Sequence, residues 1–332
     1  MGKWKTLILD QKTIKRLVDV KDAVREVEKA FKYHGEGKTQ MPAKVYIHLD
    51  KYKGDFRAMP AHVDALKSSG IKWVNVHPGN RPKGLPTVMA LIILSDPTNG
   101  FPLSVMDATY VTALRTGAAG GVAAKYLARK DSSKVALVGC GVQAATQLKA
   151  LEGIFNIKEV RVWGKKKGEA AKFKKLMGKK NPFKITIADT VKSCVNDSDI
   201  IVTTTPSRKP LVKIEWVKKG AHINAIGADA KGKQELDPRI LKKAKIVIDA
   251  WEQASHSGEI NVPLKKRQIT KKDIYADIGA IVCGSKKGRT NKQEITVFDS
   301  TGLAIQDIAV AHLLYKKARK NKKGRYVEFF QT

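Results

Sequence analysis

The sequence predicts an α/β protein in which a doubly wound parallel sheet is joined to a β-rich α+β domain. Three observations predict it: a glycine-rich turn at residues 139–144, a regular alternation of strands and helices over residues 134–249, and a series of short strands over residues 44–107. Alternation is typical of parallel sheets, whereas short strands separated by Gly, Pro and Asn are typical of antiparallel ones. The chain has 332 residues, of which 42% are hydrophobic, and can form two cores.

The amino-terminal part begins with an amphipathic helix over residues 20–34, which Gly35 ends. Apolar or alternating runs then predict strands at residues 44–49, 56–60, 70–76, 87–95 and 102–107. A helix over residues 112–127 follows, for which Thr116 is the candidate N-cap. Its run of small residues at 117–121 indicates that another element packs very close to it.

The turn at residues 139–144 has the pattern of a phosphate-binding loop. The strand 134–138 ends in Gly139-Cys140-Gly141-Val142-Gln143-Ala144 and is followed by a helix that runs to Phe155. Gly139 allows the tight turn, Gly141 lets the backbone approach a pyrophosphate, and Ala144 permits close packing of the helix on the strand. The start of the helix supplies free N–H groups and a positive dipole end. The segment therefore predicts a Rossmann dinucleotide-binding domain.

Further strands of this sheet are predicted at residues 159–163, 183–188, 199–204, 221–226 and 245–249. The remainder predicts a helix near residues 272–282, a short apolar run at 295–298 and a final helix over 301–320 capped by Asp299 or Ser300. We expect the last helix to return to the first domain. Residues 1–120 with 303–332 are then the substrate-binding and dimerisation domain, and residues 121–302 the Rossmann dinucleotide-binding domain.

The formal net charge of +32 is the unusual feature of the composition. A strongly basic chain can bind nucleic acids by neutralising their phosphates. Here, however, lysines are spread along nearly every predicted helix and loop, and the sequence has no basic segment interleaved with aromatic residues. We therefore interpret the charge as a solvated lysine-rich surface that attracts anionic metabolites and cofactors, and nucleic-acid binding is the less favoured alternative.

The spacing of the cysteines and histidines does not predict a metal site. Cys140, Cys194 and Cys283 are scattered and have neither metal-ligand spacing nor the arrangement of a disulfide framework. The seven histidines likewise show no metal spacing. The sequence has no amino-terminal apolar signal and no apolar run of the roughly eighteen residues that a membrane helix needs. We therefore expect a cytoplasmic protein without a membrane segment.

Four segments, at residues 72–80, 113–119, 224–229 and 298–302, carry a resemblance to a known family. In this order they resemble the ornithine cyclodeaminase/μ-crystallin family and, within it, the archaeal alanine dehydrogenases, over nearly the whole chain. The resemblance implies reversible NAD(P)-dependent oxidative deamination of L-alanine to pyruvate and ammonia. It also implies a homodimer formed through the β-rich domain.

The resemblance assigns roles to five side chains at the substrate. Lys72 is the proton donor and acceptor, and a partly desolvated lysine beside other cations has its pKa lowered towards neutrality. Arg115 holds the substrate carboxylate, which a planar guanidinium suits, and Lys44 and Arg57 match two further substrate positions. Asp229 is placed near the reacting amine or the nicotinamide. From the residues alone, a solvent-facing Lys72, a surface Arg115 and a capping Asp229 remain alternatives.

The cofactor preference is predicted from one absent carboxylate. An acidic residue at the end of the second strand normally binds the ribose hydroxyls of NAD. Here Gly164 stands in that place and three lysines, 165–167, follow it, which suits a 2′-phosphate and favours NADP(H) over NAD(H). The alternative is that these lysines belong to the general basic surface. The residues predicted to bind the cofactor are Thr116, Gly139, Gly141, Val142, Gln143, Ala144, Trp163, Gly164, Lys165, Thr204, Thr205, Ala225, Ile226, Gly227 and Ser300.

Two other reactions of the family and two non-enzymatic functions remain open. A ketimine or imine reductase shares the cofactor, the lysine and the arginine but needs no free ammonia. Ornithine cyclodeaminases carry a glutamate at the position of Arg57, whose positive charge would repel the side-chain ammonium of ornithine. The non-enzymatic alternatives are an NADPH-binding protein, which the joint presence of Lys72, Arg115 and Asp229 disfavours, and a basic nucleic-acid-binding protein.

Overall fold

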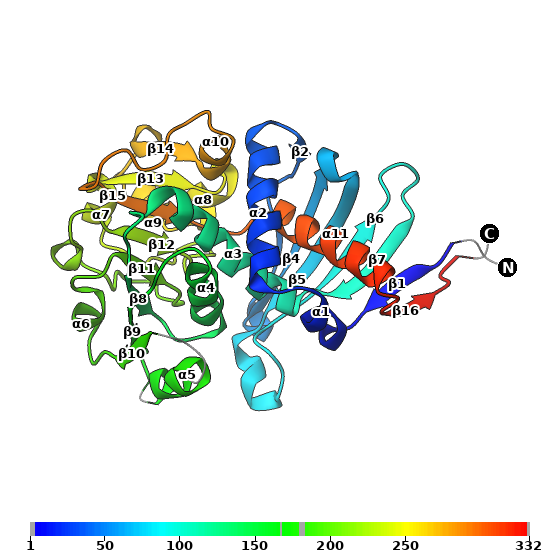
Figure 1. The fold of residues 1–332 in the computed structure, drawn as a ribbon, viewed down its shortest axis with the longest axis horizontal. Coiled ribbons are helices and arrows are strands. Elements are labelled where there is room, and N and C mark those ends of the chain that lie inside the picture. The colour runs from blue at the N-terminus through cyan, green and yellow to red at the C-terminus, as the bar shows by residue number, and fades with distance from the viewer. Residues whose placement is uncertain (1–3, 167, 179–182, 331–332) are drawn as a thin grey trace. The chain divides into compact units, whose positions relative to one another are not determined.

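The computed structural model describes residues 4–166, 168–178 and 183–330, and the chain forms two compact units (Figure 1). The first unit consists of Met1–Arg115 with Leu303–Thr332, and the second consists of Thr116–Gly302. The boundary after Arg115 lies inside helix α3, Thr109–Leu127, so this helix contributes residues to both units.

The first unit is built on a mixed sheet with the strand order β16-β1-β7-β6-β5-β4-β2, in which β3 also pairs with β4. β1 and β7 run parallel, and the other pairs run antiparallel. The series β3 to β7 confirms the predicted antiparallel strands, whereas β1, β2 and β16 were not predicted. The strands span Thr6–Leu9 (β1), Thr39–Gln40 (β2), Val45–Leu49 (β3), Gly54–Val63 (β4), Ser68–Val76 (β5), Val88–Ser95 (β6), Pro102–Asp107 (β7) and Arg325–Val327 (β16).

Helices α2 and α11 lie side by side on one face of this sheet (Figure 1). The predicted amphipathic helix is confirmed as α2, whose Asp19 side chain accepts a hydrogen bond from the N–H of Asp22 and whose apolar stripe is buried. α11 packs against β4, β5 and β6, so the last helix returns to the first unit. The helical elements of this unit are α1 (Gln11–Leu17), α2 (Val20–Gly35) and α11 (Ala304–Lys320), with short 3-10 turns η1 (Asp50–Tyr52), η2 (Asp64–Leu66) and η3 (Pro78–Lys83).

The strand register decides which side chains face these helices. Met59 of β4 lies opposite Lys72 of β5, which lies opposite Ile92 of β6, and all three are buried. Because successive strand side chains point to opposite faces, the residues next to them face away from the helices. That side of the sheet, which we call the outer apolar face, carries the exposed side chains of Val45, Ile47, Trp73, Leu91 and Ile93.

The second unit is a doubly wound sheet with the order β10-β9-β8-β11-β12-β15-β13-β14, and all its pairs are parallel. The chain runs outward from β8 through β9 to β10 and then returns to β11 beside β8. In such sheets ligands bind at the carboxyl ends of the strands where this reversal occurs. The strands span Lys134–Val138 (β8), Glu159–Trp163 (β9), Lys184–Ile187 (β10), Ile200–Thr203 (β11), His222–Ala225 (β12), Ala244–Ile248 (β13), Ile274–Asp277 (β14) and Ile295–Asp299 (β15). All six predicted parallel strands are found, with ends that differ by at most one residue.

Both faces of this sheet are buried, which explains the continuous apolar runs of its strands. In β8, Val135 and Leu137 pack in one buried cluster with Leu148 of α4, while Ala136 and Val138 pack in a second cluster on the other face. The helical elements are α4 (Val142–Glu152), α5 (Glu169–Gly178), α6 (Val191–Val195), α7 (Pro238–Lys243), α8 (Trp251–Ser257), α9 (Asn261–Lys265) and α10 (Ile278–Val282), with 3-10 turns η4 (Ile214–Trp216) and η5 (Lys271–Asp273).

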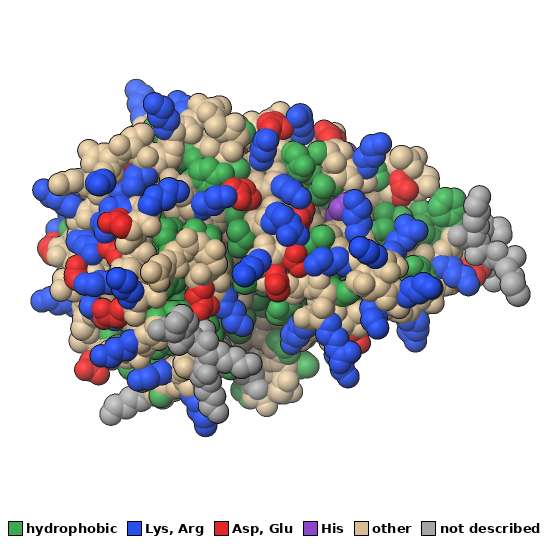
Figure 2. Space-filling model, viewed as in Figure 1, with side chains coloured by type: hydrophobic (Ala, Val, Ile, Leu, Met, Phe, Trp, Pro, Cys, Tyr) green, Lys and Arg blue, Asp and Glu red, His purple; other side chains and the backbone are tan. Residues whose placement is uncertain are grey.

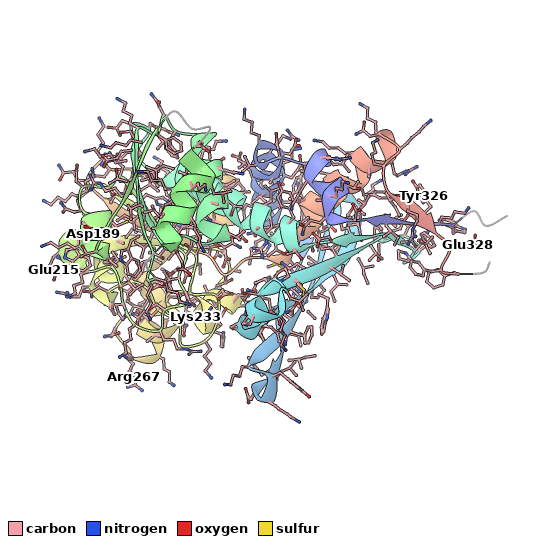
Figure 3. All side chains as sticks on the ribbon, turned by 90° about the horizontal axis from the view of Figure 1, so that it is seen from below. Asp189, Glu215, Lys233, Arg267, Tyr326 and Glu328 are labelled. Atoms are coloured by element: carbon pink, nitrogen blue, oxygen red, sulfur yellow. The ribbon has the colours of Figure 1, made fainter. Side chains whose placement is uncertain are left out.

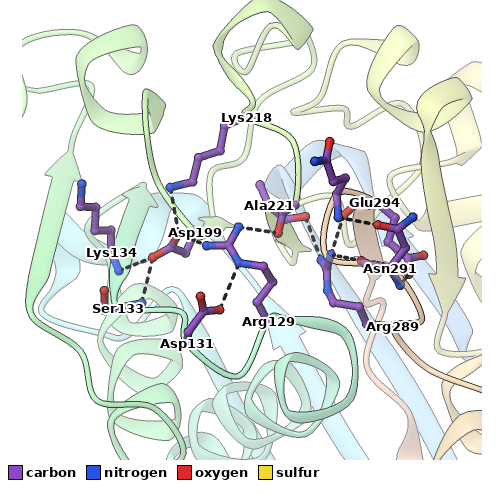
Figure 4. A network of polar contacts seen from close by, with 12 residues as sticks. Arg129, Asp131, Ser133, Lys134, Asp199, Lys218, Ala221, Arg289, Asn291 and Glu294 are labelled. Atoms are coloured by element: carbon purple, nitrogen blue, oxygen red, sulfur yellow. Dashed lines mark hydrogen bonds and ion pairs between the residues drawn. The ribbon is translucent and has the colours of Figure 1, made fainter.

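A charged network binds together the segments that enter this sheet at the amino ends of its strands (Figure 4). Asp199, directly before β11, accepts hydrogen bonds from the backbone N–H groups of Ser133 and Lys134, at 2.9 Å each, and pairs with Arg129 and Lys218. Arg289 donates to backbone carbonyls before β12 and β15. Side chains thus satisfy the backbone groups at this edge of the sheet, as buried polar groups require.

Three predicted helix boundaries were wrong. α3 begins at Thr109 instead of Thr112, because the Asp107 side chain accepts a hydrogen bond from the N–H of Tyr110, so Thr116 lies inside the helix and is not its N-cap. α11 begins at Ala304 after Leu303, and neither Asp299 nor Ser300 caps it. The helix predicted near 272–282 is α10 preceded by strand β14. Residues 274–277 form a strand because they pair with β13, and the local periodicity of the sequence does not reveal this pairing.

Figure 2 shows the distribution of charged side chains on one face of the molecule. Lys and Arg side chains are spread over this face, with Asp and Glu among them. Among the described residues, no helix is long and apolar enough to cross a membrane. The same residues contain no group of three or more His, Cys, Asp and Glu side chains placed to hold a metal ion.

The predicted close packing of the small-residue run is found between α3 and α4. A Cβ atom on Gly117 would lie 2.5 Å from the carbonyl oxygen of Thr146, and one on Gly121 would lie 2.9 Å from the Cβ atom of Ala150. Gln147 of α4 donates a hydrogen bond of 2.8 Å to the carbonyl oxygen of Thr116. The glycines therefore permit a contact in which one helix backbone nearly touches the next helix.

We expect Gly117→Ala to lower the free energy of unfolding by about 1–3 kcal/mol, because the added methyl group meets backbone that cannot move away alone. The higher helix propensity of alanine acts in the opposite direction and is smaller. Urea denaturation followed by circular dichroism measures the change. Gly153→Ala is the matched control, since a Cβ atom there makes only an ordinary 3.6 Å contact. Equal stability of the two variants would contradict the account.

Candidate active site

A buried cluster of charged side chains lies in the first unit, between the sheet and two helices. Lys72 of β5 donates a hydrogen bond of 2.7 Å to Oδ2 of Asp307 in the first turn of α11. Arg115 of α3 donates from Nε to Oδ1 of the same carboxylate at 3.1 Å and from Nη1 to Oε1 of Gln306 at 2.9 Å. Lys72 and Asp307 are completely buried. One carboxylate therefore holds two cations that lie far apart in the sequence.

The environment of Lys72 favours its neutral form. Burial has the largest effect, and the charges of Arg115 and Lys44 act in the same direction, so that the pKa of Lys72 is lowered to about 7 against the opposing charge of Asp307. A lysine that titrates near neutrality can both accept and donate a proton under physiological conditions. The cluster can therefore perform acid–base chemistry.

Arg57 has a carboxylate partner that the sequence did not reveal. Its Nε donates to Oδ1 of Asp55 at 2.7 Å and its Nη2 to Oδ2 at 3.2 Å, and its guanidinium lies 5.1 Å from the centre of the Tyr46 ring. Asp55 and Arg57 are two residues apart on β4, so their side chains share one face of the strand. The predicted repulsion of an ornithine ammonium by Arg57 is weakened by this neighbouring negative charge.

The residues predicted to bind the cofactor lie mainly at one edge of the second unit. Because the strands are parallel, the segments that follow β8, β9, β11, β12 and β15 leave the sheet at the same end. These segments contain the phosphate-turn residues and the following members of the predicted set: Gly164, Lys165, Thr204, Thr205, Ile226, Gly227 and Ser300, with Trp163 and Ala225 as the last residues of β9 and β12. Thr116, in α3, is the exception.

The phosphate turn has the geometry that its sequence requires. Gly139 has φ +113, which only glycine adopts readily, and a Cβ atom there would lie 2.5 Å from Oγ1 of Thr204. Gly141 is the N-cap of α4, makes no side-chain cap, and has open space where a Cβ atom would stand. Val142, the first residue of α4, is exposed, while Ala144 is buried against the sheet. The start of this helix can therefore accept an anion at close range.

Two buried hydroxyl groups at the same edge support a ligand site. Oγ1 of Thr204 and Oγ of Ser300 have no hydrogen-bond partner among the residues that the structure describes. Buried polar atoms are nearly always paired, and an unpaired one calls for an explanation such as a ligand. These hydroxyls and the open phosphate turn lie at the same edge of the sheet, and together they suit the polar groups of a dinucleotide.

The position expected to distinguish the two nicotinamide cofactors has no carboxylate. A Cβ atom on Gly164 would lie 2.6 Å from Sγ of Cys140 in the phosphate turn. Any side chain at this position therefore requires the Cys140 side chain to move. Lys165 and Lys166 are exposed, and Lys167 lies outside the described residues.

Asp229 follows β12 in the second unit and is half-buried. Its carboxylate pairs with Lys233, which Figure 3 labels. The described residues of the first unit contain the other candidate substrate residues: Lys44, Arg57, Lys72 and Arg115.

Sequence reasoning missed the acidic half of the buried cluster. Gln306 and Asp307 are fully buried polar residues in the otherwise apolar first turns of α11. Two polar residues within an apolar helical segment are a recognisable signal, because such positions are rarely buried without a partner. Asp55 gave no comparable signal.

The chain is similar to one protein family over almost its whole length. A family model described as the ornithine cyclodeaminase/mu-crystallin family matches residues 4–322. The alanine dehydrogenase of Archaeoglobus fulgidus is 54% identical over 327 residues, which cover 98% of this chain and 99% of that protein. A solved archaeal alanine dehydrogenase dimer with bound NAD is 53% identical with a TM-score of 0.94, and the match covers 98% of this chain and 100% of that chain. The Δ1-pyrroline-2-carboxylate reductase of Thermococcus litoralis, solved with NADH and L-proline, is 39% identical with a TM-score of 0.94, over 97% of this chain and 100% of that chain.

We expect Asp307→Asn to lower the free energy of unfolding by about 3–5 kcal/mol, because it leaves the buried guanidinium of Arg115, and Lys72 whenever it is protonated, without a counter-charge. Urea denaturation measures the loss. Asp131→Asn serves as the control, since Asp131 is 79% exposed and pairs with Arg129 at the surface, where such changes usually stay within about 0.5 kcal/mol. If both variants unfold at the same urea concentration, the buried cluster does not stabilise the first unit.

Proposed function

This chain belongs to the ornithine cyclodeaminase/mu-crystallin family, and we propose that it is an alanine dehydrogenase. The proposed reaction is the reversible oxidative deamination of L-alanine to pyruvate and ammonia with a nicotinamide dinucleotide. The observation in the structure that carries the proposal is the buried Lys72–Asp307–Arg115 cluster, in a chain 54% identical to an alanine dehydrogenase. The cluster supplies a proton carrier beside a cation suited to a carboxylate.

In this proposal Arg115 binds the carboxylate of alanine or pyruvate, and the positive charge of Lys44 or Arg57 assists it. A guanidinium has five N–H donors, and the bonds to Asp307 and Gln306 use only part of that capacity while they fix its plane. Asp307 keeps Lys72 and Arg115 in place without neutralising the site completely. The cluster thereby orients a small oxo-acid, which is the main contribution of a protein to such a reaction.

Lys72 moves the protons. In alanine oxidation its neutral amine takes a proton from the substrate ammonium and later assists the addition of water to the imine carbon. In the reverse direction ammonia adds to the carbonyl carbon of pyruvate, and the ammonium form of Lys72 then donates the proton with which the resulting hydroxyl leaves as water. The bound dinucleotide supplies the acceptor or donor of the hydride at the carbon that carries nitrogen. Asp229 is proposed as the second catalytic group, near the reacting amine or the nicotinamide.

We further propose that NADP(H) is preferred over NAD(H). Gly164 offers no acceptor for a ribose 2′-hydroxyl, and the exposed Lys165 is available to a 2′-phosphate. The proximity of Cys140 to the missing Cβ of Gly164 disfavours a carboxylate at that position. The related structures contain NAD or NADH, so this chain would differ from them in the ribose contact.

We also propose a homodimer formed through the outer apolar face. Val45 lies opposite Ala58, Ala58 opposite Trp73, and Trp73 opposite Leu91, so the exposed apolar side chains form a row across four strands. Contiguous exposed apolar side chains of this kind mark interaction sites. The related archaeal alanine dehydrogenase is a dimer.

A cytoplasmic location is proposed from the cysteines. Cys140, Cys194 and Cys283 are free thiols, which suits a reducing compartment.

The first test is oxidation of NADPH and of NADH by the purified protein with pyruvate, each with and without ammonium. We expect oxidation that depends on ammonium, and a higher kcat/KM with NADPH. A ketimine or imine reductase would instead oxidise the cofactor with a cyclic ketimine and no ammonium. Absence of oxidation with pyruvate and ammonium would eliminate the alanine dehydrogenase proposal. Equal kcat/KM for the two cofactors would eliminate the NADP(H) preference alone.

Lys72 should impose a pH dependence on alanine oxidation. Because the neutral amine is the active form and its pKa is about 7, kcat/KM is expected to rise about tenfold per pH unit below 7 and to level off above it. Lys72→Met should lower kcat by about 10²-fold or more, the usual contribution of acid–base catalysis, and remove this limb. Lys12→Met, at an exposed lysine of α1, is the control. A Lys72→Met variant with the wild-type pH profile would assign the proton transfer elsewhere.

A further inference from the structure

The carboxyl edge of the second unit contains three buried carboxylates that bind backbone N–H groups in succession. Oε1 of Glu235 accepts hydrogen bonds from N and Oγ1 of Thr205, both at 2.6 Å, and Oε2 accepts one from N of Gly227 at 2.9 Å. Glu235 in turn donates its own N–H to the carboxylate of Glu259 at 3.0 Å. Glu259 donates its N–H to Oδ1 of Asp299 at 2.9 Å. We call Glu235, Glu259 and Asp299 the carboxylate ladder.

Each member of the carboxylate ladder also accepts a second backbone donor. Glu259 accepts the N–H of Leu236 at 2.7 Å, and Asp299 accepts that of Ile260 at 3.0 Å. All three carboxylates are completely buried. Burial raises the pKa of Glu235 to about 7, while the hydrogen bonds from Thr205 and Gly227 oppose the rise. Burying these acidic groups is unfavourable, and the hydrogen bonds that compensate for it hold the loops in fixed positions.

The ladder connects the segments that follow three neighbouring strands. Thr205 follows β11, Gly227 follows β12, and Asp299 is the last residue of β15. The contact at Gly227 is so close that a Cβ atom would lie 2.5 Å from Oε2 of Glu235 and 2.3 Å from the carbonyl oxygen of Thr205. Glu235 thus sets the spacing between the loops after β11 and β12 with one rigid group.

These loops also hold the unpartnered hydroxyls of the candidate cofactor site. Thr204 directly precedes the Glu235 contact at Thr205, and Ser300 directly follows Asp299. Oγ1 of Thr204 and Oγ of Ser300 are buried and have no partner within the described parts of the chain. The two hydroxyls are therefore positioned by neighbours in the ladder and remain available to a ligand.

The two halves of a dinucleotide use different parts of such a sheet. The phosphate turn follows β8 and the adenosine ribose position follows β9, on one side of the reversal between β8 and β11. The loops after β11, β12 and β15 lie on the other side, which leaves them to the nicotinamide half. Resting on the proposed function, we propose that Glu235 is a positioning residue for the nicotinamide half of the cofactor, acting through the loops that carry Thr204, Thr205 and Gly227.

The test is dinucleotide binding by full-length Glu235→Gln, measured by isothermal titration calorimetry with NADPH and NADH as probes. The amide group keeps the size of the side chain but presents a donor to donors, so one loop contact is lost. We expect the Kd of the dinucleotides to rise about tenfold, the value of one hydrogen bond to a charged group. ADP-ribose, which lacks the nicotinamide, should bind the variant as it binds the wild type. The KM for the dinucleotide should rise with Kd, while the KM for alanine stays unchanged.

Asp199→Asn is the matched control, because Asp199 is also a buried carboxylate that accepts two backbone N–H groups, at the opposite end of β11. It should lower stability without changing any of the three binding constants. Equal weakening of ADP-ribose and dinucleotide binding by Glu235→Gln, or no weakening of either, would overturn the inference. If Glu235→Gln does not fold, Glu259→Gln is judged by the same criteria, because the Glu259 carboxylate accepts the N–H of Glu235 and so holds the next member of the ladder in place. Wild-type protein that binds neither NADPH nor NADH would overturn the proposed function itself, a result distinct from these.

Discussion

The shared carboxylate of Asp307 is the interaction on which the first unit depends. It joins β5, the part of α3 that belongs to the first unit, and the returning helix α11, through residues 72, 115 and 307. Without it the Arg115 guanidinium would be buried with no counter-charge, which is far more costly than the loss of a surface pair. The negative charge of Asp307 also opposes burial and Arg115, which lower the pKa of Lys72, and the balance leaves that pKa at about 7. The same contact therefore closes the fold and limits how far the pKa of the proposed proton carrier falls.

Buried carboxylates at the two ends of the second unit's sheet have different kinds of partner. At the amino ends of the strands, Asp199 is joined to Arg129 and Lys218, so carboxylate and cations neutralise one another. At the carboxyl ends, the buried carboxylates Glu235 and Glu259 are satisfied by backbone N–H groups instead. These hydrogen bonds fix the loops without using Oγ1 of Thr204 or Oγ of Ser300, the two hydroxyls of the candidate cofactor site.

The residues proposed to bind the substrate and those proposed to bind the cofactor meet in the sequence within helix α3. Arg115, assigned to the substrate, is the last residue of the first unit before Thr116, assigned to the cofactor, begins the second. Close packing through Gly117 and Gly121 then fixes α3 against α4, the helix that starts at the phosphate turn. One helix therefore carries neighbouring residues with the two different tasks.

The sequence by itself determined the alternation of strands and helices, the phosphate turn and the family, because period, glycine spacing and short motifs are local properties. Lys72 and Arg115 were also identifiable from their motifs. Only the tertiary structure decided that they share Asp307, 235 and 192 residues away, and that Asp55 balances Arg57. It also decided that residues 274–277 form a strand, since β13 provides the pairing. The contacts of Asp307 and the pairing of β13 with β14 depend on how the chain folds back, which no local pattern encodes.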